Sequence, residues 1–391
     1  MDATLQGIRA RESLQQPEWQ GYDQMPYVHE ALENSAPLVQ GRDIRSLRSV
    51  LAQVASGEAK VIQCGDCAED INDVNPTDVA RKIALLNLLA EALQLAAHQP
   101  VLRVGRIAGQ FAKPRSQTHE CFGEGEIPVY RGDMVNTHSP DPDGRKPDPR
   151  RILHGYLAAN DIIGHLGWQN GPSRKPLIDP PIWTSHEALL LDFELPMLRR
   201  DAEGQMYLGS THWPWIGERT RSVDGAHVAL LAEVFNPVAC KIGPSISTTE
   251  LLALCERLDP NCEPGRLTLI PRMGADLVAD KLPRLVETVR AAGHPVIWLT
   301  DPMHGNTIAA PCGRKTRIVP TIVKEVSAFQ RAVTLAGGVA GGLHLETTPD
   351  NVTECVNGVE ELGRVGNNYR TLCDPRLTPS QALAVVSIWN K

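Results

Sequence analysis

Short runs of apolar residues alternate with longer amphipathic stretches along most of this chain. Such runs, bounded by turn-forming residues, are typical of strands that are buried on both faces of a parallel sheet. The stretches between them, such as 78–97, 251–258 and 282–293, have helical spacing, and the last ends at Gly293, a residue type that often follows a helix. The predicted strands are residues 61–64, 101–104, 181–184, 206–209, 238–242, 267–270, 296–299 and 343–346.

Eight predicted strands, each separated from the next by helical sequence, favour a closed (β/α)8 TIM barrel, an α/β fold. An open, doubly wound sheet is the rival architecture. That alternative is weakened because no G-x-G-x-x-G segment follows the first predicted strand.

The chain is longer than a plain barrel, which needs about 250 residues. We predict an N-terminal extension, residues 1–57, followed by a catalytic barrel, residues 58–391, with a C-terminal helix in 380–389. A long insertion, residues 114–178, separates the second and third strands, and it contains a loop at 138–151 that is rich in Pro, Asp and Gly and is expected to be exposed.

Composition excludes several classes of function. The formal net charge of −7 argues against a nucleic-acid partner, and no apolar run is long enough to predict a membrane span. The first residues lack the apolar core of a signal peptide, and the nine cysteines are an odd number. Both features favour reduced thiols and a cytoplasmic protein.

Basic side chains follow several of the predicted strands. In a (β/α)8 barrel, the residues after the carboxyl ends of the strands form the active site. Any one of these side chains alone could equally be a solvated surface charge, but together they predict a site for small polyanions such as phosphates and carboxylates. The residues are Arg106, Lys113, Arg115, Arg219, Lys241 and Arg272. Lys113, Arg115 and the hydroxyl of Ser116 lie within four residues of one another on a turn interrupted by proline, which predicts a phosphate cradle.

A second set of strand-end residues could bind a metal ion. It consists of Cys67, His304, Glu346 and Asp374, whose thiolate, imidazole and two carboxylates suit a divalent ion such as Mn²⁺, Co²⁺, Zn²⁺ or Fe²⁺. Their spacing in the sequence does not support the grouping. A buried structural cysteine, a hydrogen-bonded core histidine and a redox or zinc pair with Cys64 remain alternatives.

Ten segments between residues 65 and 377 resemble the type II 3-deoxy-D-arabino-heptulosonate 7-phosphate (DAHP) synthases. They are GDCAE (65–69), GRIAGQFAKPRS (105–116), YRGDMVN (130–136), SHEALLLDFE (185–194), WIGERTR (215–221), NPVACKIGP (236–244), GRLTLIPRMG (265–274), DPMHGNT (301–307), GGLHLETTPDNVTEC (341–355) and CDPRL (373–377). The resemblance implies a TIM barrel. It also implies an enzyme that condenses phosphoenolpyruvate with erythrose 4-phosphate in the first step of the shikimate pathway.

The resemblance assigns roles to the candidate residues. Cys67, His304, Glu346 and Asp374 would be the metal ligands, with Mn²⁺ or Co²⁺ expected and Zn²⁺, Fe²⁺ or Cd²⁺ as alternatives. Phosphoenolpyruvate would be held by Arg106, Arg219, Lys241 and Arg272, with Trp215 and Glu218 nearby. Lys113, Arg115 and Ser116 would hold erythrose 4-phosphate, and Glu218 or Lys113 would handle protons. Asp301 and Pro302 form the turn that positions His304, and the thiol of Cys373 could approach Cys67.

The chain is most similar to the short family members of phenazine biosynthesis clusters, which implies that feedback inhibition by aromatic amino acids is lost. Two alternatives stay open: an amino-DAHP synthase, which uses an amino-sugar phosphate, and a non-catalytic homologue that regulates a partner such as chorismate mutase. A metallohydrolase on the same barrel is a further alternative. The expected assembly is a homo-oligomer, either a dimer or a tetramer.

Overall fold

The computed structural model describes residues 3–122, 125–168 and 181–390. The chain forms two compact units, each made of three separate segments. Unit 1 comprises Met1–Ile44, Ala68–Val79 and Ile107–Asn236, and unit 2 comprises Arg45–Cys67, Ala80–Arg106 and Pro237–Lys391. No helix among the described residues has both the length and the apolar composition that crossing a membrane would require.

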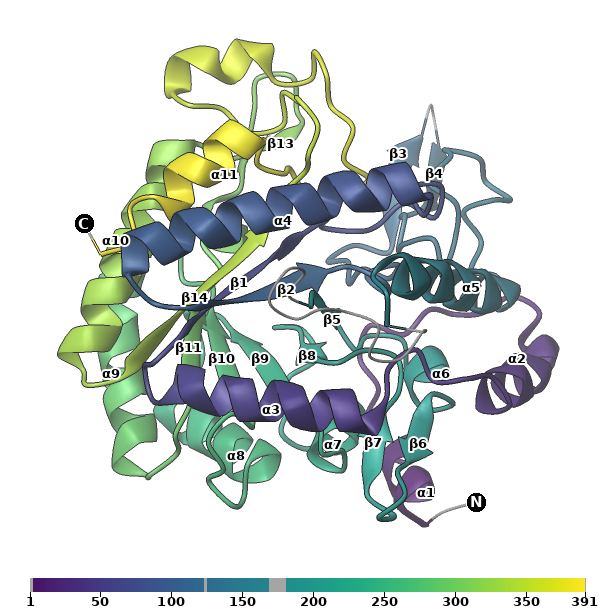
Figure 1. Cartoon of the computed structure of the whole chain (residues 1–391). Coiled ribbons are helices and arrows are strands. Elements are labelled where there is room, and N and C mark those ends of the chain that lie inside the picture. Colours follow the sequence, from purple (N-terminus) through teal and green to yellow (C-terminus); the bar gives the residue numbers. More distant parts are fainter. Residues whose placement is uncertain (1–2, 123–124, 169–180, 391) are drawn as a thin grey trace. The chain divides into compact units, whose positions relative to one another are not determined.

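Six parallel strands form the core of unit 2, in the order β2-β1-β14-β11-β10-β9. Every residue of β9 and β10 is buried, as expected for strands that are apolar on both faces. Figure 1 shows β1, β14, β11, β10 and β9 side by side. The strands are β1 (Lys60–Gly65), β2 (Val101–Arg106), β9 (Val238–Ile242), β10 (Leu267–Pro271), β11 (Ile297–Thr300) and β14 (Val339–Glu346).

The helices of unit 2 follow its strands in the sequence. α9 contacts both α8 and α10, and α10 also contacts α11. Two of these helices begin at side-chain caps: Ser247 accepts a hydrogen bond from the backbone of Glu250, and Thr378 forms a capping box with Gln381. The helices are α4 (Pro76–Ala97), α8 (Thr248–Leu258), α9 (Val278–Ala291), α10 (Val319–Leu335) and α11 (Pro379–Val386), and α3 (Gly41–Ala55) lies mostly in this unit. The short elements are the 3₁₀ turns η2 (His304–Asn306) and η3 (Val359–Arg364) and the hairpin of β12 (Ile308–Ala309) and β13 (Lys315–Thr316).

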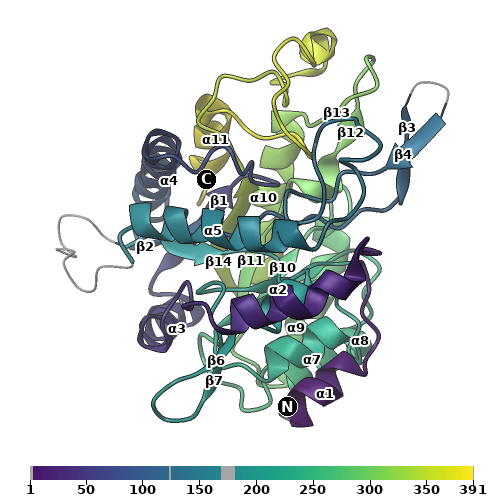
Figure 2. The same cartoon turned by 90° about the vertical axis from the view of Figure 1, so that its right-hand side faces the viewer.

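Unit 1 contains two short strands, β5 (Trp183–Ser185) and β8 (Trp215–Ile216), which a parallel bridge between Glu187 and Trp215 connects. Its helix α1 lies beside α7, and α2 lies beside α5 (Figure 2). Helix α2 also packs against α6. The helices are α1 (Ala3–Arg9), α2 (Met25–Glu33), α5 (Arg150–His165), α6 (Leu191–Glu194) and α7 (Ala226–Ala232), with the 3₁₀ turn η1 (Tyr22–Gln24). The antiparallel hairpins are β3 (His119–Phe122) with β4 (Gly125–Pro128) and β6 (Leu198–Arg200) with β7 (Met206–Leu208).

The strand order confirms the predicted (β/α)8 TIM barrel. The eight-stranded sheet has the order β5-β2-β1-β14-β11-β10-β9-β8, so successive strands of the chain are neighbours and the first strand, β1, pairs with the last, β14. An isolated parallel bridge between Glu187, two residues after β5, and Trp215 of β8 links the chain at the two ends of this order. A parallel sheet in which successive strands are neighbours and the first strand pairs with the last has the topology of a (β/α)8 barrel.

One predicted strand is wrong. Residues 206–209 do not belong to the barrel: Met206–Leu208 is β7, which pairs antiparallel with β6. The fourth barrel strand is instead β8, which has two residues and is too short for its pattern to indicate a strand. The predicted insertion holds the β3–β4 hairpin and α5 up to residue 168, and residues 169–178 lie outside the described part. The boundary between residues 57 and 58 stays a prediction.

Candidate active site

The four predicted metal ligands lie in unit 2, at or just after the ends of neighbouring strands. Cys67 follows β1, Glu346 is the last residue of β14, and His304 opens the turn after β11. These strands are adjacent, and Gly65 of β1 is paired with Glu346. Because parallel strands end at the same edge of a sheet, they bring the three side chains together. Asp374 comes from an irregular segment. Its backbone carbonyl accepts a hydrogen bond from the hydroxyl of Thr371.

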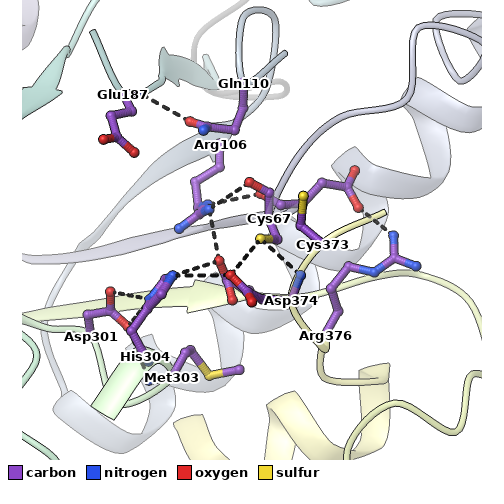
Figure 3. Close-up of polar contacts among 12 residues, drawn as sticks. Cys67, Arg106, Gln110, Glu187, Asp301, Met303, His304, Cys373, Asp374 and Arg376 are labelled. Carbon is purple, nitrogen blue, oxygen red and sulfur yellow. Dashed lines mark hydrogen bonds and ion pairs between the residues drawn. The ribbon is translucent and has the colours of Figure 1, made fainter. Parts of the chain in front are cut away.

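The polar atoms of these four side chains converge, and Figure 3 shows three of them, Cys67, His304 and Asp374. The Nε2 atom of His304 lies 3.2 Å from Oε1 of Glu346 and 3.9 Å from Oδ2 of Asp374, which in turn lies 3.4 Å from Sγ of Cys67. Cys67, Glu346 and Asp374 are buried, and their ligand atoms lie within 4.8 Å of one another. One thiolate, one imidazole and two carboxylates in this arrangement fit a divalent metal ion.

Asp301 orients His304. Its carboxylate lies 2.7 Å and 3.0 Å from Nδ1 of His304 and accepts hydrogen bonds from the backbone of Met303 and His304. Nε2 is therefore the imidazole atom that faces Glu346. Metal-binding histidines commonly carry such a carboxylate on their second nitrogen. Burial alone would raise the pKa of Asp301, but His304 and Lys241 hold that pKa well below its usual value. The geometry confirms the predicted positioning role of this turn.

Glu346 lies between two buried arginines. Arg106 approaches its Oε1 at 3.2 Å, and Arg317 approaches its Oε2 at 2.8 Å. Arg106 also donates to the carbonyl oxygens of Asp66 and Cys67 and lies 2.5 Å from Nε2 of His344. The guanidinium groups compensate the charge of a carboxylate that would otherwise be costly to bury.

Asp374 also has a cationic partner: Nζ of Lys315 lies 2.7 Å from its Oδ1. Sequence reasoning missed both Lys315 and Arg317. The signal that could have found them is the basic segment Arg314-Lys315-Thr316-Arg317, which comes shortly after the DPMHGNT motif.

Two predicted anion-binding residues follow or end neighbouring strands of the same unit. Lys241 lies in β9, is buried, and contacts Oδ2 of Asp301 at 2.8 Å; burial lowers its pKa. Arg272 directly follows β10, is partly buried, and its backbone N–H donates to the carbonyl of Ile242. The pairing of β9 with β10 therefore brings these two cations to the same edge of the sheet.

The remaining predicted substrate-binding residues lie in unit 1. The guanidinium of Arg219 donates to the Oγ atom of Ser116 at 2.7 Å, so the turn of Lys113, Arg115 and Ser116 contacts the segment after β8. Lys113 is buried, whereas Arg115 is partly exposed and Ser116 and Arg219 are exposed. Trp215 is buried in β8.

Glu218 is held by a residue that sequence reasoning missed. Arg221 donates to both carboxylate oxygens of Glu218, at 3.0 Å and 2.9 Å. A bidentate guanidinium contact of this kind fixes the orientation of the carboxylate.

Comparison with known proteins identifies the family. The model of the class-II DAHP synthetase family matches residues 3–170 and 166–388. The chain belongs to this family. It is 58% identical over 390 residues to a probable phospho-2-dehydro-3-deoxyheptonate aldolase of Pseudomonas fluorescens, with 100% of this chain and 98% of that protein covered.

Two further class-II relatives are more distant. The phospho-2-dehydro-3-deoxyheptonate aldolase of Streptomyces coelicolor is 40% identical, with 95% of this chain and 93% of that protein covered. The protein named phospho-2-dehydro-3-deoxyheptonate aldolase AroG of Mycolicibacterium smegmatis is 38% identical, with coverages of 97% and 92%. A solved phospho-2-dehydro-3-deoxyheptonate aldolase of Francisella tularensis has a TM-score of 0.56 at 11% identity, with 97% of each chain covered, and this likeness supports the fold alone.

A buried carboxylate holds the loop that leads to Lys113 in this class-II chain. Glu69 of the GDCAE motif accepts hydrogen bonds from three successive backbone N–H groups, those of Ala108, Gly109 and Gln110, at 2.8–3.1 Å. Ala108 has a φ of +65°, a strained conformation for a residue with a side chain. A Cβ atom at Gly109 would overlap the ring of His186, so only glycine fits there.

Proposed function

We propose that this chain is a metal-dependent DAHP synthase. It would condense phosphoenolpyruvate with D-erythrose 4-phosphate and water to give DAHP and inorganic phosphate, the first step of the shikimate pathway. The observation that carries the proposal is the convergence of Cys67, His304, Glu346 and Asp374 in a chain of the class-II family. A decayed, non-catalytic homologue would be expected to have lost at least one of these four groups.

We propose that the cations form two groups, each of which binds one of the two substrates. Arg106, Lys241, Arg272 and Arg219 would bind phosphoenolpyruvate, with Trp215 and Glu218 nearby, and Lys113, Arg115 and Ser116 would bind erythrose 4-phosphate. Support comes from the adjacency of Lys241 and Arg272 at neighbouring strands and from the hydrogen bond between Arg219 and Ser116. Both substrates are anions, so cations are needed to offset their mutual repulsion and to orient them.

In the proposed reaction, C3 of phosphoenolpyruvate forms a bond to the aldehyde carbon of erythrose 4-phosphate. Water adds at C2, and phosphate leaves with cleavage of the C–O bond. A bound divalent ion, with Mn²⁺ or Co²⁺ expected, would supply Lewis acidity toward the aldehyde oxygen. Glu218 and Lys113 are the candidates for proton handling. Arg221 fixes the orientation of the Glu218 carboxylate through its two hydrogen bonds.

We further propose that the enzyme lacks feedback inhibition by aromatic amino acids and supplies phenazine biosynthesis. The alignment with the Mycolicibacterium smegmatis relative runs over 431 residues, which is longer than this chain of 391, so that relative has segments that are absent here. The Pseudomonas fluorescens relative matches over 390 residues without such additions. Inhibitor sites built from extra segments would be lost with them.

The assembly and the location of the protein stay predictions. We expect a homo-oligomer, either a dimer or a tetramer, in the cytoplasm. Sedimentation of the purified protein, alone and mixed with chorismate mutase, would measure the oligomeric state and test that partner.

The test is the rate of phosphoenolpyruvate consumption with erythrose 4-phosphate. Wild-type protein should lose activity on chelation and regain it with Mn²⁺ or Co²⁺, whereas His304→Ala should stay inactive after the same treatment. Added Phe, Tyr and Trp should leave the rate unchanged. An amino-sugar phosphate offered in place of erythrose 4-phosphate should react slowly. Full activity of His304→Ala after chelation would overturn the proposed metal role.

A further inference from the structure

A buried carboxylate on α10 connects two loops of the proposed active site. Glu325 is fully buried, and its Oε1 accepts a hydrogen bond from the backbone N–H of Gly274 at 3.0 Å. Its Oε2 accepts a hydrogen bond from the side-chain amide of Asn306 at 2.5 Å. One carboxylate therefore holds the loop after β10 and the turn after β11, both in unit 2.

Each of these loops carries a candidate site residue close to the bond. Arg272, proposed to bind phosphoenolpyruvate, lies two residues before Gly274. His304, a proposed metal ligand, lies two residues before Asn306. A small change in either backbone would therefore shift a guanidinium or an imidazole, and displacements of about 1 Å are enough to impair a site of this kind.

Asn306 joins the same two loops directly. Its side-chain oxygen accepts from the backbone N–H of Ala275 at 3.0 Å, and its amide donates to the carbonyl of Pro302 at 2.8 Å. The backbones also approach closely, because a Cβ atom at Gly305 would overlap the backbone nitrogen of Gly274. The contact between the loops thus depends on two glycines, one amide and one carboxylate.

The hydrogen bonds at Glu325 are those of the ionised carboxylate, the form present above its raised pKa, in which both oxygens accept. Both partners are N–H donors, so replacement by Gln would leave one donor facing another donor. Burial raises the pKa of Glu325 to about 7, with the charge of Asp301 adding to the rise. The neighbouring Lys324 does not pair with the carboxylate of Glu325, since the Lys324 ammonium is bonded to the exposed Asp276.

We propose that Glu325 is a positioning residue that sets the placement of Arg272 and His304 together, so that metal binding and phosphoenolpyruvate binding depend on one carboxylate. The inference rests on the proposed function. Since both loops share this anchor, ordering one of them by its ligand should favour the other ligand. Thermodynamic linkage then requires that each ligand strengthen the other by the same factor.

The experiment measures binding by calorimetry on the metal-free full chain, without erythrose 4-phosphate. Mn²⁺ is titrated with and without phosphoenolpyruvate, and phosphoenolpyruvate with and without Mn²⁺. In Glu325→Gln, both affinities should fall about 10–100-fold, the usual effect of losing a group that orients a ligand, and the mutual strengthening should shrink. Lys324→Met, the adjacent position on α10, is the matched control and should bind both as wild type does.

Asn306→Ala is the second variant. It removes all the bonds by which the Asn306 side chain holds the turn of His304, whereas the loop after β10 loses only the bond from Ala275 and keeps the one between Gly274 and Glu325. Its Mn²⁺ affinity should therefore fall more than its affinity for phosphoenolpyruvate. If Glu325→Gln does not fold, this asymmetry decides the matter.

A folded Glu325→Gln with wild-type affinities, or equal losses of both ligands in Asn306→Ala, would overturn the inference. Failure of the proposed function would look different. In that case the wild-type chain would bind both ligands and respond to the substitutions, yet consume no phosphoenolpyruvate when erythrose 4-phosphate is added.

Discussion

Replacing Asp301 with Asn should weaken metal binding without removing any proposed ligand. The carboxylate of Asp301 contacts Nδ1 of His304 and Nζ of Lys241. The Asn side chain can still accept one hydrogen bond, but its amide would face the ammonium of Lys241 as a second donor. Loss of a carboxylate behind a metal-binding histidine costs about 10–100-fold in metal affinity. This corresponds to about 1.4–2.8 kcal/mol.

Stability should fall as well, because Lys241 would remain buried without its carboxylate. Breaking a buried ion pair from one side costs about 3–5 kcal/mol. Mn²⁺ titration of the metal-free protein measures the first effect, and urea unfolding of the same sample measures the second. Asp276→Asn is the control, because its ion pair with Lys324 is exposed and is worth little. Unchanged Mn²⁺ affinity in a folded Asp301→Asn protein would refute the orienting role.

Three further predictions concern pH, phosphoenolpyruvate use and oxidation. The raised pKa of Glu325 means that the folded state keeps a proton that the unfolded state loses. The free energy of unfolding should therefore fall by up to about 3 kcal/mol as pH rises from 4.5 to about 7, and Glu325→Gln should not show this component in urea titrations across that range. Arg219→Ala removes a cation bonded to Ser116 and should raise the KM for phosphoenolpyruvate about tenfold or more, with wild-type thermal unfolding as the check on folding. Sγ of Cys67 lies 3.3 Å from the backbone nitrogen of Asp374, the residue after Cys373. Hydrogen peroxide should therefore oxidise the thiols of Cys67 and Cys373 to a disulfide in the metal-free protein, and the peroxide is reduced to two waters. Peptide mapping should find the link, and prior loading with Mn²⁺ should suppress it.

The sequence was sufficient to predict the barrel because its strands are buried on both faces. Runs such as 238–242 and 267–270 are wholly buried strands. The same rule failed at 206–209. Tyr207 and Leu208 are buried, so their pattern resembles that of a barrel strand, although they form a hairpin with β6.

The site could be predicted only in part, for a related reason. Cys67, His304 and Glu346 stand at or after strand ends, where the fold itself brings side chains together. The residues that support these ligands do not stand at strand ends. Arg317 follows a small hairpin and Glu325 lies within a helix, and each reaches the site through tertiary packing that has no period in the sequence.

The condensation should depend on one metal ion bound by the four converging side chains. The most direct measurement is the stoichiometry of the reaction in metal-free protein titrated with Mn²⁺. We predict that one phosphoenolpyruvate and one erythrose 4-phosphate disappear for each phosphate released, and that the rate reaches its maximum at one Mn²⁺ per chain. Phosphate release without loss of erythrose 4-phosphate, or a full rate in the metal-free protein, would contradict the account.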